Sequence, residues 1–375
     1  MRVGRVLEYI VDLYFMNRRI KDTKISMLLL GAPGIGKSTV VRDAAKAIAE
    51  RLNKEYVEIN NGNFEDVLSN PERYFFLLDV RLYVHEAPEL SGLPVPDINK
   101  KIVYYLPPEW AQVLSVGSGI LFLDEMTVIR DNMLRAALFQ IALDRKIGYL
   151  KINDDVLIVA AGNRDEHNAL AVPPPAPLVN RFFVIDVDPP TLDEWAVFMN
   201  ERYGNNWNTA VYGYLKLFKE DFLSLPPDPE TFENFPTPRS WTYTAIATEP
   251  FMGNPVANKD VIRDIATGYL GAAVGEKFTA FATKNLDVER IMSEPKSFFS
   301  LDLEDKYFVV SIGPRKVGLE RTIKFVNAIG NKEPEFGLIA ILALPEWKKQ
   351  FLNIISMLKV NKIKTSLNKV LPMKL

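Results

Sequence analysis

The chain has 375 residues, no cysteine and two histidines, and its 45 Lys+Arg nearly balance its 47 Asp+Glu, for a net charge of −2. The lack of cysteine excludes disulfides, thiolate nucleophiles, zinc fingers and iron–sulfur clusters, and two histidines argue against a multi-histidine metal site. The near-zero net charge gives no overall reason to expect a nucleic acid or an anionic membrane as the partner.

The N-terminal segment, MRVGRVLEYIVDLYFMNRRI, is partly apolar, but Glu8 and Asp12 interrupt the run, which argues against a secretory signal. Its apolar residues recur at helical spacing, so the segment is predicted to be an amphipathic helix. No stretch approaches the roughly 20 apolar residues that a membrane-spanning helix needs. We therefore expect a cytoplasmic location and no membrane partner.

Residues 1–190 alternate short apolar runs with segments of helical periodicity. Strands are predicted, in chain order, at Ile25–Leu30, Glu55–Asn60, Tyr74–Val84, Gly119–Leu123, Val156–Ala161 and Phe182–Val187. Helices are predicted at Ser38–Asn53 and Asn132–Leu143. Short apolar strands separated by helices are typical of a parallel sheet covered on both faces, so we predict an α/β fold with a three-layer αβα core.

The pattern changes after Pro189-Pro190. Residues 191–299 show helical periodicity and no convincing buried strand, and residues 300–375 are mostly helical in pattern, with one candidate strand at Tyr307–Ile312. A domain boundary is therefore predicted near residue 190, followed by an all-α domain and a helical C-terminal extension. Two or three domains agree with a usual size of about 100–200 residues each.

The strongest motif is a phosphate-binding loop that fits G-x-x-x-x-G-K-[ST] in full: Gly31, Ala32, Pro33, Gly34, Ile35, Gly36, Lys37 and Ser38. An apolar strand precedes it and a helix follows. Glycines let backbone N–H groups wrap a phosphate, and the helix presents its positive end to the same anion. Lys37 is expected to contact the β- and γ-phosphates of ATP, and Ser38 to ligate Mg²⁺. Thr39 is included among the nucleotide-binding residues.

Two polar positions follow at the ends of later strands. Asp124 and Glu125 close the aliphatic run GILFLDEM, a pattern typical of a Walker B motif downstream of a phosphate loop. Asp124 would hold Mg²⁺ through a water, and Glu125 would polarise the attacking water. Asn163 ends the next buried strand, where its amide could contact the γ-phosphate and orient that water. The structural alternative for Asn163 is a left-handed turn after Gly162.

Two arginines complete the set of candidates. Arg181 stands just before the last predicted strand of the first domain, and Arg239 opens a helix in the second, where Pro238 suits a first helical turn. An isolated arginine is normally a surface residue or an ion-pair partner. These two are selected only because the preceding motifs predict an arginine in each neighbourhood.

In this order, the motifs resemble those of AAA+ ATPases, and in detail those of the MoxR-like branch of the helix-2-insert clade, encoded beside von Willebrand A-domain proteins. The resemblance covers about residues 20–285 and rests on these segments: LSGLPVPD (90–97), LFLDEM (121–126), AAGNRDE (160–166), PLVNRFF (177–183), TPRSW (237–241) and AAVGEKFTAF (272–281). Residues 300–375 carry no motif that contributes to it.

The resemblance implies a P-loop NTPase core at 1–190 with a helix-2 insert within about 62–118, and a helical lid at 191–299 that 300–375 extends. Arg181 corresponds to an arginine finger that acts on ATP in a neighbouring subunit. Arg239 corresponds to sensor 2, which acts on nucleotide in its own subunit. A homo-oligomeric, hexameric ring is expected. Within the insert, Gly92-Leu93-Pro94 and Tyr104-Tyr105 are candidates for the pore side, and a surface hairpin with partly buried aromatics is the alternative.

The leading hypothesis is therefore an ATPase that remodels, activates or assembles a protein complex, with a von Willebrand A-domain protein as a candidate client. The first alternative is a DNA or RNA translocase of the same clade. Nucleic acid is disfavoured because the sequence shows neither a basic pore nor an appended DNA-binding element. The second alternative is a nucleotide-gated scaffold without turnover, which the intact pair of Asp124 and Glu125 argues against.

Overall fold

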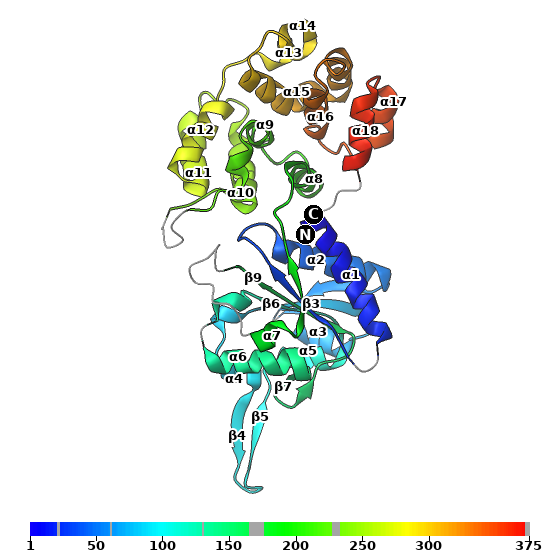
Figure 1. The fold of residues 1–375 in the computed structure, drawn as a ribbon, viewed down its shortest axis with the longest axis vertical. Helices are drawn as coiled ribbons and strands as arrows, with labels where there is room; N and C mark the ends of the chain where they lie inside the picture. Colours follow the sequence, from blue (N-terminus) through cyan, green and yellow to red (C-terminus); the bar gives the residue numbers. More distant parts are fainter. Residues whose placement is uncertain (21–22, 61, 130, 165–175, 227–232, 372–375) are drawn as a thin grey trace. The chain divides into compact units, whose positions relative to one another are not determined.

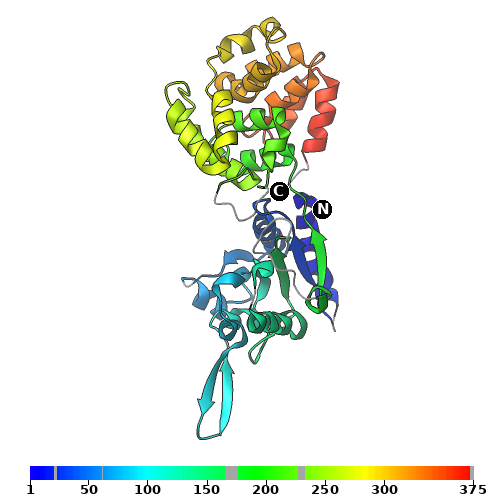
Figure 2. The same cartoon turned by 60° about the vertical axis from the view of Figure 1, so that its left-hand side comes forward.

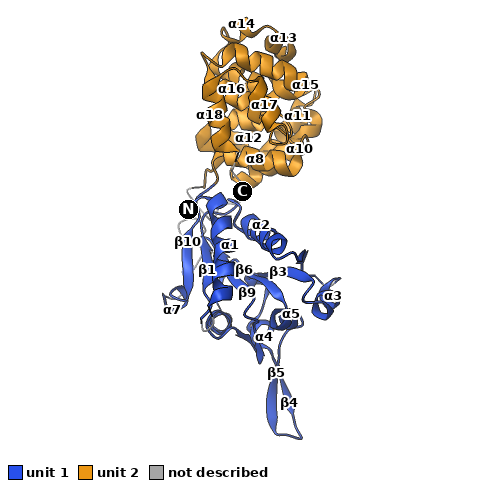
Figure 3. Ribbon diagram, turned by 90° about the vertical axis from the view of Figure 1, so that its right-hand side faces the viewer, with its two compact units in different colours: residues 1–189 blue, residues 190–375 orange. Residues whose placement is uncertain are grey.

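The computed structural model describes residues 1–20, 23–60, 62–129, 131–164, 176–226 and 233–371. The chain divides into two compact units, Met1–Pro189 and Pro190–Leu375 (Figure 3). Each unit has a hydrophobic cluster of its own. The α/β fold followed by a helical region, as predicted from the sequence, is confirmed.

Unit 1 is built on a six-stranded sheet in the order β10-β1-β9-β6-β3-β2 (Figure 1). Its strands are β1 (Ser26–Leu30), β2 (Glu55–Glu58), β3 (Tyr74–Arg81), β6 (Ser118–Asp124), β9 (Val156–Gly162) and β10 (Phe182–Asp186). Every neighbouring pair is parallel. The carboxyl ends of the strands therefore meet at one edge, where β9 lies between β1 and β6.

Helices cover both faces of this sheet. One face carries α1 (Val3–Arg19) and α2 (Lys37–Arg51), and the other carries α3 (Phe64–Ser69), α4 (Ala87–Ser91), α5 (Ala111–Val116) and α6 (Asn132–Phe139). Successive side chains of β3 point to opposite faces of the sheet. Phe75 packs edge-on against Tyr14 of α1, with the ring centres 5.2 Å apart, while Phe76 joins the hydrophobic cluster on the other face. Among the helices described, none is long and apolar enough to cross a membrane.

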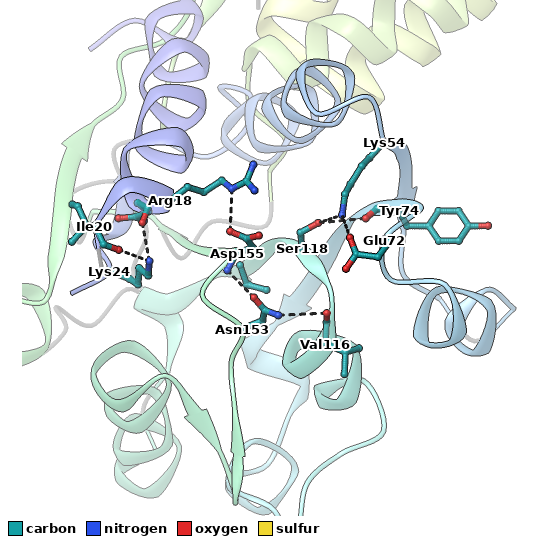
Figure 4. Close-up of polar contacts among 12 residues, drawn as sticks. Arg18, Ile20, Lys24, Lys54, Glu72, Tyr74, Val116, Ser118, Asn153 and Asp155 are labelled. Carbon is teal, nitrogen blue, oxygen red and sulfur yellow. Dashed lines mark hydrogen bonds and ion pairs between the residues drawn. The ribbon is translucent and has the colours of Figure 1, made fainter. Parts of the chain in front are cut away.

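Polar side chains tie together the segments that precede the strands, at the amino-terminal edge of the sheet (Figure 4). Lys54 Nζ donates to Ser118 Oγ at 2.9 Å and lies 3.8 Å from the Glu72 carboxylate. Arg18 Nε donates to Asp155 Oδ1 at 3.1 Å. This edge is fastened by contacts within the chain, whereas ligands of open parallel sheets bind at the opposite, carboxyl edge.

Two antiparallel hairpins leave this body. β4 (Leu93–Asp97) pairs with β5 (Ile102–Leu106), and β7 (Lys146–Ile147) pairs with β8 (Leu150–Lys151). The β4–β5 hairpin projects from the rest of unit 1 (Figure 2) and lies within residues 62–118, where the resemblance implies an insert. Tyr104 and Tyr105 are 38% and 54% exposed. The place of this hairpin in a ring stays a prediction.

Unit 2 is helical, and its described residues form no strand. Its helices are α8 (Leu192–Tyr203), α9 (Ala210–Leu217), α10 (Pro238–Thr248), α11 (Lys259–Leu270), α12 (Ala272–Ala282), α13 (Val288–Ser293), α14 (Pro295–Phe298), α15 (Leu303–Ile329), α16 (Pro334–Leu342), α17 (Phe351–Met357) and α18 (Asn361–Val370). Because α15 packs on α9, α13 and α16, residues beyond 300 share one core with those before it.

The strand predicted at Tyr307–Ile312 is wrong, because these residues lie inside α15. Neighbouring helices surround this part of α15, and Tyr307 through Ser311 are all buried. A helix buried on every side shows no apolar stripe, so its sequence is a continuous apolar run that resembles a buried strand.

Arg315 fastens the loop between α8 and α9 to α15. Its Nη1 donates to the carbonyl oxygens of Asn205 at 2.7 Å and Trp207 at 2.6 Å, and Nη2 donates to that of Gly204 at 3.1 Å. The guanidinium also lies 4.9 Å from the centre of the Trp207 ring. Burial lowers the pKa of Arg315 to about 10, so the side chain stays charged at neutral pH.

We expect Arg315→Met to destabilise unit 2 by about 3 kcal/mol, because the change removes the donor from four backbone carbonyl groups while keeping an apolar stem. Denaturant unfolding followed by tryptophan fluorescence measures this loss. Arg321→Met, at an exposed position of the same helix, is the matched control and should cost less than about 0.5 kcal/mol. Equal losses in the two variants would contradict the role assigned to Arg315.

Candidate nucleotide-binding site

The loop from Gly31 to Gly36 joins β1 to α2 at the carboxyl edge of the sheet. Gly34 and Gly36 have φ of 73° and 102°, a region that side-chain-bearing residues rarely adopt. Gly36 is the N-cap of α2, and no side chain caps this helix. Its first backbone N–H groups are therefore available to an anion.

The Lys37 side chain is buried and folded back over its own loop. Its Nζ donates to the carbonyl oxygens of Gly31 and Ala32 at 2.9 Å each. The same Nζ donates to Asn163 Oδ1 at 2.8 Å, although the two residues are far apart in the sequence. Asn163 follows β9, the strand next to β1, so the strand order brings together the predicted phosphate lysine and the amide predicted to orient the water.

Ser38 and Asp124 meet beside this contact. Ser38 Oγ, in the first turn of α2, donates to Asp124 Oδ2 at 3.0 Å. Asp124 ends β6, and its Oδ1 accepts a hydrogen bond from the Glu125 backbone N–H at 2.9 Å. A hydroxyl and a carboxylate side by side are hard oxygen ligands of the kind that Mg²⁺ prefers. These residues thus fit the ion predicted from the sequence.

Glu125 is held in an unusual backbone conformation. Its φ of 59° and ψ of 35° lie in the left-handed region, which is uncommon for a residue other than glycine and concentrates at functional sites. Its Oε2 accepts a weak hydrogen bond from Asn163 Nδ2 at 3.4 Å. Lys37, Asn163 and Glu125 thereby form one continuous polar chain across three strand ends.

Thr127, which no sequence motif indicates, positions Asn163. Thr127 lies in the short helical turn Met126–Val128 and is 2% exposed. Its Oγ1 accepts the backbone N–H of Asn163 at 2.9 Å. A Cβ added at Gly162 would lie 2.5 Å from Thr127 Cγ2, so the turn and the end of β9 fit closely. Nothing in the local sequence distinguishes this threonine from an ordinary turn residue.

Asp79 is a second residue that sequence reasoning missed. It lies near the end of β3, the strand beside β6, and its Oδ1 has no hydrogen-bond partner within the described chain. Burial, and then the nearby Asp124 carboxylate, raise the pKa of Asp79. A single acid in the apolar run YFFLLDVR was the available signal, and its carboxyl group lies near the predicted Mg²⁺ ligand Asp124.

Of the two predicted arginines, only Arg181 belongs to the same unit as this cluster. Arg181 is exposed between α7 (Ala176–Val179) and β10, at the amino end of that edge strand, so it lies at the opposite edge of the sheet from Lys37. Arg239 belongs to unit 2, where it is exposed in the first turn of α10. Thr237 caps that helix by accepting the Ser240 N–H at 3.1 Å.

This combination of a phosphate loop, a parallel sheet and converging polar strand ends defines a P-loop nucleotide-binding fold. Residues 27–186 match the family "ATPase family associated with various cellular activities (AAA)". The match runs from β1 to β10 and includes every predicted site residue except Arg239. This part of the chain is therefore similar to an AAA ATPase family domain.

Several solved structures resemble the chain at low overall scores. An ADP complex of NtrX from Brucella abortus shares 13% identity at a TM-score of 0.35, over 96% of this chain and 67% of that one. A closed state of Hsp104 shares 16% sequence identity at a TM-score of 0.36, over 82% of this chain and 48% of the Hsp104 chain. The ORC1 protein of Aeropyrum pernix, in complex with DNA, shares 13% sequence identity at a TM-score of 0.36, over 97% of this chain and 82% of the ORC1 chain. No curated protein matches the sequence.

We expect Thr127→Val to lower the rate of nucleotide turnover by about tenfold or more, because a buried Asn163 N–H loses its acceptor while the side-chain shape is kept. Affinity for a fluorescent ADP analogue should change little. Steady-state turnover and a binding titration measure the two effects. Thr127→Ser keeps the hydroxyl and should retain most activity, and a loss as large as that of Thr127→Val would contradict the hydrogen-bond explanation.

Proposed function

We propose that the chain is a MoxR-like AAA+ ATPase that hydrolyses ATP with Mg²⁺ at the subunit interfaces of a hexameric ring. In this proposal it acts in the cytoplasm and uses hydrolysis to remodel, activate or assemble a partner protein complex, with a von Willebrand A-domain protein as the candidate client. The observation that carries the ATPase proposal is the polar chain from Lys37 through Asn163 to Glu125, beside the pair of Ser38 and Asp124.

The same contacts give each residue a role. The uncapped N–H groups of α2 and the loop would hold the phosphates, and Lys37 would exchange its loop carbonyl partners for β- and γ-phosphate oxygens. Ser38 and Asp124 would hold Mg²⁺, which when bound neutralises phosphate charge. Glu125 would accept a proton from the water that attacks the γ-phosphorus, as the bond to ADP breaks. Asn163 contacts both Lys37 and Glu125, so it would align phosphate and water.

The position of Arg181 supports action on a neighbouring subunit. Arg181 is exposed at the amino end of an edge strand, whereas the phosphate loop lies at the carboxyl edge of the same sheet. Five residues of β10 separate these edges, which corresponds to about 17 Å of extended chain. A long arginine side chain does not span that distance to its own nucleotide. In the proposal Arg239, from the helical unit, acts on nucleotide bound in its own subunit.

Glu125→Gln should bind ATP with near wild-type affinity and hydrolyse it at least about 100-fold more slowly, since the amide cannot accept the proton. The amide keeps the shape of the side chain and an oxygen for Asn163. Phosphate release and ATP binding, measured on the same preparation, test this. Turnover equal to that of the wild type would contradict the role of Glu125, and absent turnover in the wild type would contradict the ATPase proposal itself.

Mixing two inactive variants tests the shared site. Arg181→Ala should lose most of its turnover, because arginine fingers contribute about 10³–10⁵ in rate. In mixed rings of Arg181→Ala and Glu125→Gln subunits, some interfaces combine an intact Arg181 with an intact Glu125, so part of the activity should return. Co-assembly is checked by affinity tagging one variant. Co-assembled rings that remain inactive would argue against action across the interface.

A further inference from the structure

The β4–β5 hairpin exposes apolar side chains that the rest of the described chain leaves uncovered. At the turn, Ile98 is 85% exposed, and the strands contribute further exposed residues: Leu93, Val95, Ile102, Val103, Tyr105 and Leu106. Large exposed apolar patches on a folded domain mark interaction sites. In the register, Leu93 and Leu106 share one face of the hairpin, whereas Val103 and Tyr105 lie on the other, so the hairpin presents more than one apolar face.

The outer edge of β4 is blocked against pairing with a further strand. In the antiparallel register Pro94 lies opposite Tyr105, and Pro96 lies opposite Val103. Antiparallel pairs alternate between hydrogen-bonded and non-hydrogen-bonded positions, and proline has no N–H, so the two prolines suit the non-hydrogen-bonded positions. The outward backbone groups of β4 then include no N–H donor at Pro94 or Pro96. Natural edge strands commonly use proline in this way to prevent pairing with another strand.

The outer edge of β5 carries no such protection. By the same alternation, the backbone N–H and C=O groups of Val103 and Tyr105 point away from β4. Within the described chain, no other segment donates or accepts a backbone hydrogen bond at these residues. The hairpin is therefore asymmetric, with one edge closed by proline and the other open for strand pairing.

A groove of about 830 Å³ runs beside this open edge. Four consecutive residues of β5 line one side, and the turn of the β7–β8 hairpin, with α4 and the end of α6, lines the rest: Val103, Tyr104, Tyr105, Leu106, Gly148, Tyr149, Ser91 and Gln140. A Cβ built on Gly148 would lie 3.2 Å from the Tyr105 carbonyl oxygen, so the turn lies against the Tyr105 end of this edge. No lining residue is charged, and Tyr149 is 65% exposed.

We propose that the open edge of β5 binds an extended, uncharged and largely apolar polypeptide segment as an added strand. This inference rests on the proposed function and names how the client would be held. Donors and acceptors at strand spacing match an extended polypeptide backbone, and tyrosines in the groove offer contacts to alternate side chains. The five residues of β5 correspond to a segment of about 17 Å. A nucleic acid backbone finds no positively charged lining here.

The test uses the 375-residue chain and a permanently unfolded probe, reduced α-lactalbumin whose thiols are capped with neutral carbamidomethyl groups and which carries a fluorescent label. No nucleotide is needed, because the groove lies within one chain. Val103→Pro removes one outward N–H, whereas the matched Val103→Ala removes the side chain and keeps the N–H. We expect Val103→Pro to weaken binding in fluorescence anisotropy by about tenfold or more, and Val103→Ala by less than about threefold.

Tyr105→Pro and Tyr105→Ala repeat the comparison at the second outward position. Because β4 already contains proline opposite Val103 and Tyr105, we expect the hairpin to accommodate a proline at these positions. Circular dichroism melts check that each variant is folded. Equal weakening by proline and alanine, or no binding by the wild type, overturns strand addition. Loss of self-association in Val103→Pro without loss of probe binding identifies a second copy as the occupant and also overturns it. ATP turnover is measured separately, so this inference and the ATPase proposal fail independently.

Discussion

The hydrogen bond from Lys37 Nζ to Asn163 Oδ1 is the contact on which the rest of the site depends. It forms only because β9 lies between β1 and β6, so the amide that follows β9 is placed between the phosphate loop and the acidic pair. The segment after β1 supplies the Lys37 ammonium group, and the segment after β6 supplies the Glu125 carboxylate. The Asn163 side chain, which follows β9 between them, contacts both groups. A different strand order would leave the same motifs intact and separate them by a full strand spacing of about 4.8 Å.

Two unfavourable features of the site, a buried ammonium group and a left-handed backbone, are stabilised by hydrogen bonds within the fold. A buried ammonium group is expensive unless it is fully hydrogen-bonded, and Lys37 has two loop carbonyls and one amide as acceptors. The left-handed backbone of Glu125 is supported by the Asp124 carboxylate, which accepts the Glu125 N–H. Thr127 holds the following strand end through the Asn163 N–H. The strained backbone of Glu125 thus lies at the carboxyl edge of the sheet. At the opposite, amino edge, hydrogen bonds from Lys54 and Arg18 link the segments that precede the strands.

Edge strands have two different uses in unit 1. The sheet ends at β10, and Arg181 stands exposed at its amino end, which suits an interface between subunits. The hairpin instead closes one edge with Pro94 and Pro96 and leaves β5 open beside an uncharged groove. In the proposed ring, the first edge would complete the active site of a neighbour and the second would hold a client segment. Both rest on the same physical fact, that an unpaired strand edge presents donors and acceptors to another chain.

The sequence by itself determined the phosphate loop, the acidic strand end, the α/β order of the first 190 residues and the helical character of the second unit. These features are local, because they depend on a short motif, on apolar runs bounded by glycine and on helical periodicity. Only the tertiary structure decided which residues meet. It joined Asn163 to Lys37 and Glu125, brought in Thr127 and Asp79, and buried Tyr307–Ile312 within a helix instead of a strand. The physical reason is that strand order and burial on every side arise from contacts between residues distant in sequence, which no local pattern records.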